Sequence, residues 1–242
     1  MNPSHRRRLE AVIDLEEVSR EYRRGADRVL ALDRVSLHVP RGRFVALMGP
    51  SGSGKSTLLN ILAGLDRPSS GGVRVADTDL GRLSDEDLAR FRASHIGFVF
   101  QFFNLIPVLD ARANVELPLL LTRLGRAERR ERAETALRIV GLQERARHAP
   151  GELSGGEQQR VAIARAIVSD PEIVVADEPT GDLDAKNAAD TLELLRELRL
   201  AFDKTVVMVT HDPRGREYVD QVFELDKGVL QPGSDGSDTG VT

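Results

Sequence analysis

The feature that most constrains this chain is a glycine-rich string, Gly49-Pro50-Ser51-Gly52-Ser53-Gly54-Lys55-Ser56. It fits the phosphate-loop pattern, in which two glycines enclose four residues and Lys and Ser or Thr follow. The apolar run Phe44–Met48 precedes it and helical spacing over Lys55–Leu65 follows, which predicts the strand–loop–helix context that the pattern requires. Backbone N–H groups can surround phosphate oxygens there, because glycines place no side chains in the way. The string therefore predicts a nucleotide bound through its phosphates.

Individual residues of this loop have separate expected tasks. The Lys55 ammonium is expected to reach the β- and γ-phosphates of ATP, and the Ser56 hydroxyl is expected to bind Mg²⁺. Nucleotide contacts are expected from Gly49, Pro50, Ser51, Gly52, Ser53, Gly54, Lys55, Ser56 and Thr57.

A second apolar run, Ile173–Ala176, ends in two acids, Asp177 and Glu178. Ligands of open α/β sheets bind beyond the carboxyl ends of the strands, which is where these carboxylates would lie. Asp177 is expected in the Mg²⁺ shell. Glu178 is expected to polarise a water for attack on the γ-phosphate.

The remaining pattern predicts an α/β fold in three parts. Ala11–Val18 and Val29–Val39 alternate like half-buried strands of an antiparallel layer. Thr205–Val209 fits a central parallel strand, with a helix over Ala185–Ala201 before it. Residues 101–169 predict an inserted, mostly helical subdomain. Further elements are expected at Val73–Ala76, Ile96–Phe100, the helix Ala127–Val140, Val222–Asp226 and Val229–Leu230.

The composition of the chain indicates its number of domains and excludes several classes of site and partner. The 242 residues are 40% hydrophobic and 30% charged, which suits one globular domain over residues 12–231. A flexible leader over residues 1–11 and a disordered tail over 232–242 are expected to flank it. The absence of cysteine excludes disulfides and thiolate metal sites. The net charge of -4 argues against a nucleic-acid partner, and no apolar window is long enough to predict a membrane span.

The string LSGGEQQR at Leu153–Arg160 resembles the signature motif of ABC ATPases. That resemblance extends from about Ile13 to Leu230. It implies a P-loop NTPase ABC ATPase core with an antiparallel β subdomain and an inserted α-helical subdomain. In the family, the signature opens a helix, and residues matching Ser154, Gly155 and Gly156 bind the γ-phosphate held by the other subunit. A homodimer that encloses two ATP molecules is therefore expected.

Four further matches follow from the same resemblance. Gln101 matches the Q-loop glutamine and is expected near both the reacting phosphate and Mg²⁺. Gly181–Asp184 matches the D-loop, and His211 matches the switch histidine that contacts the γ-phosphate. Tyr22 is similar to the adenine-stacking aromatic residue, although packing of its ring in the core remains an alternative.

Longer strings, such as GPSGSGKSTLLNILAGLDRPSSG and VAIARAIVSDPEIVVADEPTGDLD, resemble the lipoprotein-release and macrolide-export ATPases. This implies an ATPase that drives a separate membrane permease from the cytoplasmic face of the cell membrane. One alternative is an ABC ATPase that acts on DNA or ribosomes. The interval between Lys55 and Glu152 lacks the sustained heptads of the coiled-coil insertions expected in the DNA-acting members. Another alternative, a non-hydrolysing module, is opposed by Glu178 and His211.

An apolar run directly after Gln101 is a candidate surface for the permease. It comprises Phe102, Phe103, Leu105, Ile106, Pro107, Val108 and Leu109. A short permease helix could lie in such a groove, and Phe103 is the expected exposed anchor. The alternative is a buried seam between the core and the helical subdomain.

Overall fold

A computed structural model describes residues 11–25 and 27–231 of the chain. The leader residues 1–10 and the tail 232–242 lie outside the described residues. Ala11, which the sequence pattern places in both the leader and the first strand, is buried at the start of that strand.

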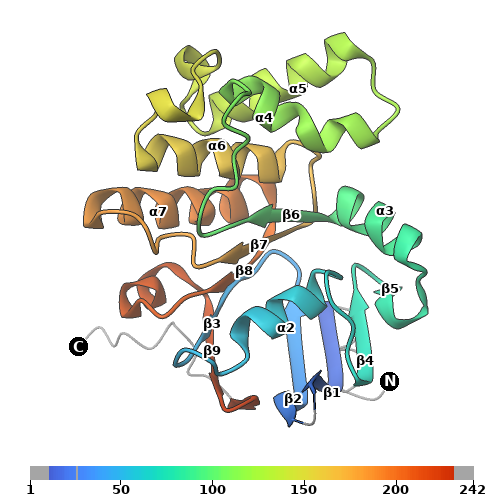
Figure 1. The fold of residues 1–242 in the computed structure, drawn as a ribbon. Coiled ribbons are helices and arrows are strands. Elements are labelled where there is room, and N and C mark those ends of the chain that lie inside the picture. The colour runs from blue at the N-terminus through green and yellow to red at the C-terminus, as the bar shows by residue number, and fades with distance from the viewer. Residues whose placement is uncertain (1–10, 26, 232–242) are drawn as a thin grey trace.

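A six-stranded sheet forms the centre of the molecule (Figure 1). Its strand order is β10-β9-β3-β8-β7-β6, and β9, β3, β8, β7 and β6 run parallel while β10 is antiparallel. The bounds are β3 Phe44–Met48, β6 Ile96–Val99, β7 Ile173–Asp177, β8 Thr205–Val209, β9 Gln221–Asp226 and β10 Val229–Gln231. All residues of β3 and β8 are buried, which explains their continuous apolar runs.

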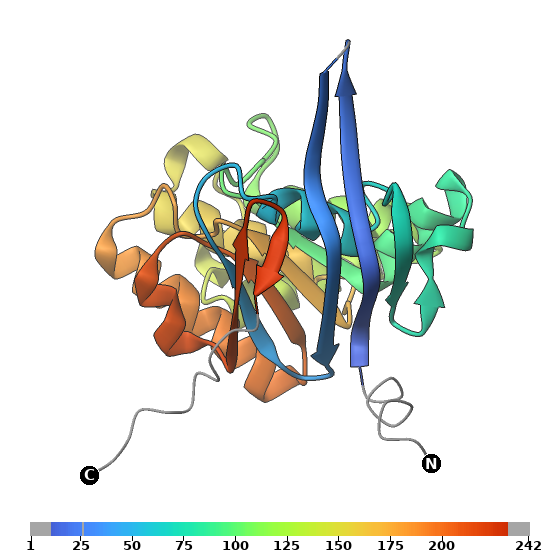
Figure 2. The ribbon, with the colours of Figure 1, turned by 90° about the horizontal axis from the view of Figure 1, so that it is seen from below.

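A four-stranded antiparallel sheet of order β2-β1-β4-β5 covers one side of this centre. Its strands are β1 Ala11–Arg24, β2 Asp27–Pro40, β4 Ser70–Val75 and β5 Thr78–Asp79. Figure 2 shows β1 and β2 running as a ribbon past the body of the molecule. Both strands are longer than the apolar alternation predicts, because backbone pairing continues from Arg20 to Arg24 through polar residues.

Helices cover both faces of the central sheet. Helix α2 (Lys55–Leu62) packs between the two sheets, in one apolar cluster with Val45, Leu47 and Val207. The alternate residues Ala46, Val206 and Met208 face the opposite cluster. Successive side chains of a strand point to opposite faces of the sheet, so each buried strand contributes to both clusters. That second cluster is shared with the helices α4 Ala111–Glu116, α5 Arg126–Ile139, α6 Gly155–Ile167 and α7 Ala185–Phe202.

The predicted fold class is confirmed, with small corrections at element boundaries. Helix α2 ends at Leu62 rather than Leu65, since Gly64 follows with a positive φ of 67°. A helix that the sequence pattern does not indicate, α3 (Asp85–His95), precedes β6. Short 3₁₀ turns occupy Leu80–Arg82, Leu117–Leu121, Gln143–Arg145, Pro150–Glu152 and Pro213–Tyr218. No helix among the described residues combines the length and apolarity needed to cross a bilayer.

Candidate functional site

The glycine-rich loop joins β3 to α2 in a conformation that only glycine adopts easily. Gly52 and Gly54 have φ values of 77° and 101°. A Cβ atom on Gly54 would overlap the carbonyl oxygen of Ala31. The loop is thus packed against β2, and its backbone is shaped before any ligand arrives.

Lys55 and Ser56 begin α2 directly after the loop. The buried Lys55 ammonium donates hydrogen bonds of 2.8 Å to the carbonyl oxygens of Gly49 and Pro50. Ser56 Oγ donates to Asp177 Oδ1 at 3.3 Å, and this contact joins the loop to the end of β7. Burial raises the pKa of Asp177, while the Ser56 hydrogen bond opposes that rise.

Two further predicted nucleotide contacts, Ser53 in the loop and Thr57 on α2, differ in their surroundings. Ser53 is buried, and its Oγ makes no hydrogen bond within the described residues. Such a hydroxyl is costly unless a further group supplies a partner, so the loop has unused hydrogen-bonding capacity. Thr57 is half-buried on the first turn of α2.

Glu178 and His211 meet beyond the ends of β7 and β8. Glu178 Oε2 lies 3.2 Å from His211 Nδ1. Glu178 has a positive φ of 46°, a conformation that costs a non-glycine residue about 1 kcal/mol or more. Its N–H donates to the Val209 carbonyl oxygen at 2.9 Å, which holds the residue in place.

Gln101 follows β6 and packs against the segment after Glu178. A Cβ on Gly181 would lie 3.0 Å from Nε2 of Gln101. Since β3, β8, β7 and β6 are parallel neighbours, their carboxyl ends share one edge of the sheet. The structure therefore brings together at that edge the predicted residues Lys55, Ser56, Gln101, Asp177, Glu178 and His211.

Ser154 is the N-cap of α6. Its Oγ accepts a hydrogen bond of 3.3 Å from the Glu157 N–H, and Glu157 Oε2 accepts one of 2.8 Å from the Ser154 N–H. This backbone hydrogen bond lowers the pKa of Glu157. The pair is a capping box, so the start of the helix is sharply defined.

The glycines after Ser154 lie against the segment between β7 and α7. A Cβ on Gly156 would overlap the Asn187 side chain, and one on Gly155 would lie 3.6 Å from Leu183. Helices α6 and α2 belong to clusters on opposite faces of the central sheet. Within the described residues, no hydrogen bond or ion pair joins Ser154, Gly155 or Gly156 to the glycine-rich loop. One copy of the chain therefore keeps its two predicted phosphate-binding segments separate.

Tyr22 lies on β1 and not in the core. Its side chain is exposed, with a relative accessibility of 38%, so the alternative of core packing is wrong. The hydroxyl donates to Asp66 Oδ2 at 2.6 Å, and the Arg20 guanidinium lies 4.5 Å from the ring centre. The ring is held at one end and offers its surface to a partner group.

Arg165 is a candidate functional residue that sequence reasoning missed. From α6, its guanidinium donates to the carbonyl oxygens of Phe103 at 2.7 Å and Asn104 at 2.5 Å. Both residues have positive φ, 55° and 49°. Arg165 therefore fixes a strained turn just after Gln101 to the helix that Ser154 begins. Its position inside the helix string VAIARAIVSD offered no sequence signal for this contact.

We expect Arg165→Met to lower ATP turnover about tenfold, which corresponds to about 1.4 kcal/mol and is within the range for lost charge-assisted hydrogen bonds. Arg165→Lys should lose less, because one ammonium can still donate. Steady-state ATPase assays on purified protein provide the measurement. The control is Arg196→Met, which removes an exposed arginine from α7. Equal rates for the Arg165→Met variant and the control would show that this turn does not influence turnover.

Comparisons with known proteins show the family of the chain. A family model described as ABC transporter matches residues 32–181. The ATP-binding protein LolD of the lipoprotein-releasing system from Chromohalobacter salexigens is 47% identical over 91% of this chain and 93% of its own length. The macrolide export ATP-binding/permease protein MacB from Burkholderia thailandensis is 45% identical, and the chain spans 36% of its length.

The fold agrees with solved structures as well. A dimeric structure of the ATP-binding cassette MJ0796 in a post-hydrolysis state, bound to ADP and Pi, has a TM-score of 0.84 and 43% identity, covering 92% of this chain and 98% of that one. The MJ0796 protein of Methanocaldococcus jannaschii is 46% identical over 91% of this chain. The family model alone matches more than half of the sequence. The chain belongs to the ABC transporter family, as an ATP-binding cassette.

Proposed function

We propose that this chain is the ATP-hydrolysing subunit of an ABC transporter complex, and that two copies enclose two ATP molecules and drive a separate membrane permease. The observation that carries the proposal is the group of polar side chains at one sheet edge. There the glycine-rich loop follows β3, Asp177 and Glu178 lie at the end of β7, and His211 follows β8. This arrangement positions phosphates, a metal ligand and a general base together.

Magnesium fits the residues that are present. Ser56 Oγ and Asp177 Oδ1 are hard oxygen donors only 3.3 Å apart, with Gln101 as the third proposed contact. The described residues contain no cluster of three or more His, Cys, Asp or Glu able to hold a metal ion. Mg²⁺ in nucleotide sites needs few protein ligands, because phosphate oxygens and waters complete its shell. The ion would neutralise charge that develops on the phosphates during transfer.

The proposed roles follow from the positions of the side chains. Lys55, now bound to loop carbonyls, would transfer its hydrogen bonds to the β- and γ-phosphates. Glu178 would take a proton from the attacking water, and His211 would contact the γ-phosphate beside it. Tyr22 would stack on adenine with its exposed ring.

The second copy completes each site in this proposal. Ser154, Gly155 and Gly156 form a helix N-terminus suited to an anion but lie apart from the loop of their own chain. A two-fold dimer would place this helix start against the nucleotide of its partner. The dimeric MJ0796 cassettes support such an assembly.

The permease would dock beside Gln101, at the cytoplasmic face of the membrane. The alternative of a buried seam is wrong for Phe102 and Val108, whose relative accessibilities are 70% and 88%. The buried Asn114 amide holds the backbone of this segment through hydrogen bonds to Ile106, Leu109 and Asp110. The loop backbone is thus held in place, with Phe102, Ile106 and Val108 exposed, while Leu105 packs against the apolar cluster of the helical layer.

The structure also corrects the expected anchor. Phe103 is half-buried and its carbonyl is bound by Arg165, so Phe102 is the more exposed of the two rings. A nearby groove of about 340 Å³ offers a larger apolar surface between the core and the helical layer. Its lining includes Leu65, Phe98, Phe100, Pro118, Leu121 and Arg165. This apolar lining favours a hydrophobic permease helix over nucleic acid.

We expect Leu121→Asp to abolish co-purification with the permease while ATPase activity of the isolated subunit stays within about twofold, as for most surface changes. Leu121 lines the groove and is 81% accessible, so a charge there should disturb docking but not folding. Leu200→Asp is the matched control, since Leu200 is 63% accessible on α7. The permease would be co-expressed with this subunit. If the Leu121→Asp variant still co-purifies with the permease, this groove is not the docking surface.

A further inference from the structure

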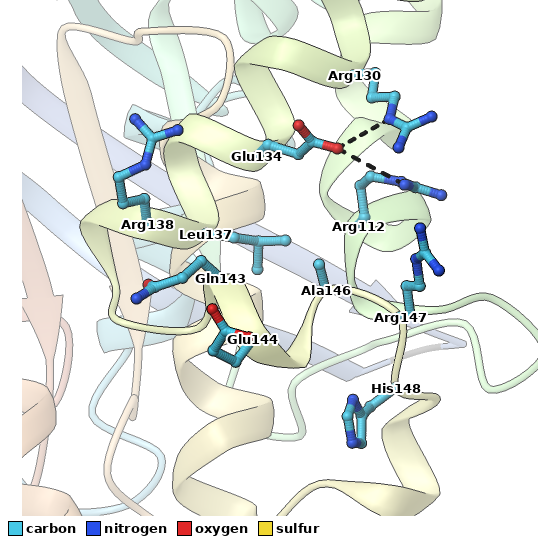
Figure 3. A pocket seen from close by; sticks show the side chains of 10 residues that line it. All are labelled: Arg112, Arg130, Glu134, Leu137, Arg138, Gln143, Glu144, Ala146, Arg147 and His148. Atoms are coloured by element: carbon cyan, nitrogen blue, oxygen red, sulfur yellow. Dashed lines mark hydrogen bonds and ion pairs between the residues drawn. The ribbon is translucent and has the colours of Figure 1, made fainter.

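A second cavity, of about 490 Å³, lies in the helical layer away from the sheet edge that holds the proposed ATP site (Figure 3). Its walls come from α4, α5 and the segment that joins α5 to α6. Four arginines and a histidine line it, against two carboxylates, Glu134 and Glu144. The basic lining residues are Arg112, Arg130, Arg138, Arg147 and His148.

The charge of this region differs from that of the whole molecule. Residues 101–169 contain eleven arginines, no lysine and eight carboxylates, whereas the whole chain has a net charge of -4. Arginine presents a planar fork of donors that matches phosphate and carboxylate groups, and lysine does not. The excess positive charge of the helical layer is therefore carried by the residue type best suited to bind oxyanions.

The carboxylates around this cavity do not occupy all of the arginine hydrogen-bond donors. Arg130 Nε does donate a hydrogen bond to Glu134, at 2.9 Å. The Arg112 side chain is 21% accessible, yet its ion pairs to Asp110, Glu116 and Glu134 are 3.6, 3.6 and 3.8 Å long. These distances exceed normal hydrogen bonds, and within the described residues its guanidinium donates none.

Arg147 has even fewer partners. Within the described part of the chain its guanidinium makes neither a hydrogen bond nor an ion pair. Figure 3 shows the guanidinium groups of Arg112, Arg130 and Arg147 gathered on one side of the cavity, next to Glu134. Arg112 and Arg130 both pair with Glu134, and Arg147 brings a third positive charge to the same wall, so a further anion there would reduce the repulsion among the three arginines.

The cavity is built on a rigid frame. The N–H groups of Ala111 and Arg112 donate to the carbonyl oxygens of His148 and Ala146, both at 2.9 Å, so the start of α4 is joined to the loop that carries Arg147. The Leu142 N–H donates to the Leu137 carbonyl oxygen at 2.8 Å and holds the end of α5 to the same loop. The backbone segments that carry Arg112 and Arg147 are thus fixed relative to each other before binding, which favours recognition of one anion.

We propose that this arginine cavity binds a phosphate-bearing anion, either a small soluble phosphate compound or the phosphorylated headgroup of an anionic lipid. Arg147 would bind the phosphate oxygens with donors that make no hydrogen bond or ion pair within the described residues, Arg112 would exchange its long ion pairs for closer contacts with the phosphate, and Arg130 would add positive charge. This cavity is separate from the proposed ATP site and would be a second binding site of the chain.

The test uses the full chain in a Lys55→Ala background, which weakens phosphate binding at the glycine-rich loop. The probes are inorganic phosphate, followed by calorimetry at constant ionic strength, and vesicles of phosphatidylcholine with or without phosphatidylglycerol, followed by co-sedimentation. We expect Arg112→Gln with Arg147→Gln to weaken binding about tenfold or more. The matched control is Arg90→Gln with Arg196→Gln, because these exposed arginines lie on α3 and α7.

The outcomes separate the two sources. Binding of inorganic phosphate alone that depends on the cavity arginines would assign a soluble ligand, and capture by phosphatidylglycerol vesicles that depends on them would assign a lipid headgroup. If neither probe binds, or both bind equally to the double variant and the control, the cavity is a solvated ion-pair cluster and the proposal is wrong. Should the double variant unfold, Arg147→Gln alone repeats the comparison, since that side chain makes no interaction to lose.

Discussion

Glu178→Gln slows ATP hydrolysis by about 100-fold or more in our account, while ATP still binds. Gln has nearly the same shape as Glu but cannot accept a proton from water at neutral pH. Glu178 sits beyond β7, 3.2 Å from His211, where it can reach a water beside the γ-phosphate. Single-turnover and steady-state ATPase assays give the rate, and equilibrium binding of a fluorescent ATP analogue gives the affinity.

The same variant should accumulate as an ATP-bound dimer, because we propose that hydrolysis is the step that releases the two copies. Its backbone strain is unchanged, since Gln and Glu tolerate the observed φ of 46° about equally. Glu193→Gln, an exposed change on α7, controls for loss of a surface charge. If the Glu178→Gln variant hydrolyses ATP at the wild-type rate, Glu178 is not the general base.

Ser154→Arg is expected to abolish measurable hydrolysis and leave ATP binding to the monomer largely intact. The long cation would occupy the helix start that we propose faces the partner's nucleotide, and so it would block closure of the dimer. The glycine-rich loop of the same copy leads into α2, which packs on the other face of the sheet from α6, so the loop should be unaffected. Analytical ultracentrifugation with ATP and an ATPase assay measure both effects.

Loss of the N-cap itself must be separated from the loss of the shared site. Removing a Ser cap costs about 1 kcal/mol. Ser84 caps α3 in the same way, accepting from the Asp87 N–H at 3.2 Å, so Ser84→Arg is the matched control. If Ser84→Arg inactivates the enzyme as thoroughly as Ser154→Arg, general destabilisation explains the result and the shared site loses its support.

The features that the sequence predicted best are the strands that are buried on both faces and the loop whose backbone conformation requires glycine. Strands β3 and β8 have the predicted bounds, because strands buried on both faces are apolar without interruption. The glycine-rich loop was found because positive φ restricts its residue types, whereas the start of α6 was identified through the resemblance of Leu153–Arg160 to the ABC signature motif.

Other features depend on tertiary contacts that no local pattern contains. Helix α3 buries only Leu88 and Phe91, so its apolar spacing is too sparse to identify, although Ser84 followed by acids at Asp85 to Asp87 was a usable capping signal. Phe102 is exposed whereas Phe103 is half-buried, and the Phe103 carbonyl is bound by Arg165, which lies far along the sequence. The ends of β1 and β2 are decided by pairing between strands and not by hydrophobicity.

The central claim, that each ATP site is shared between two copies, is tested most directly by mixing two inactive variants. Lys55→Ala destroys the glycine-rich loop of one copy, and Ser154→Arg destroys the helix start of the other. In a mixed dimer, one site combines the intact loop of the Ser154→Arg copy with the intact helix start of the Lys55→Ala copy. We predict that the mixture hydrolyses ATP while each variant alone does not, with at most one working site per mixed dimer. A mixture that forms such dimers yet stays as inactive as its components, or full activity in a strictly monomeric wild-type preparation, would contradict the account.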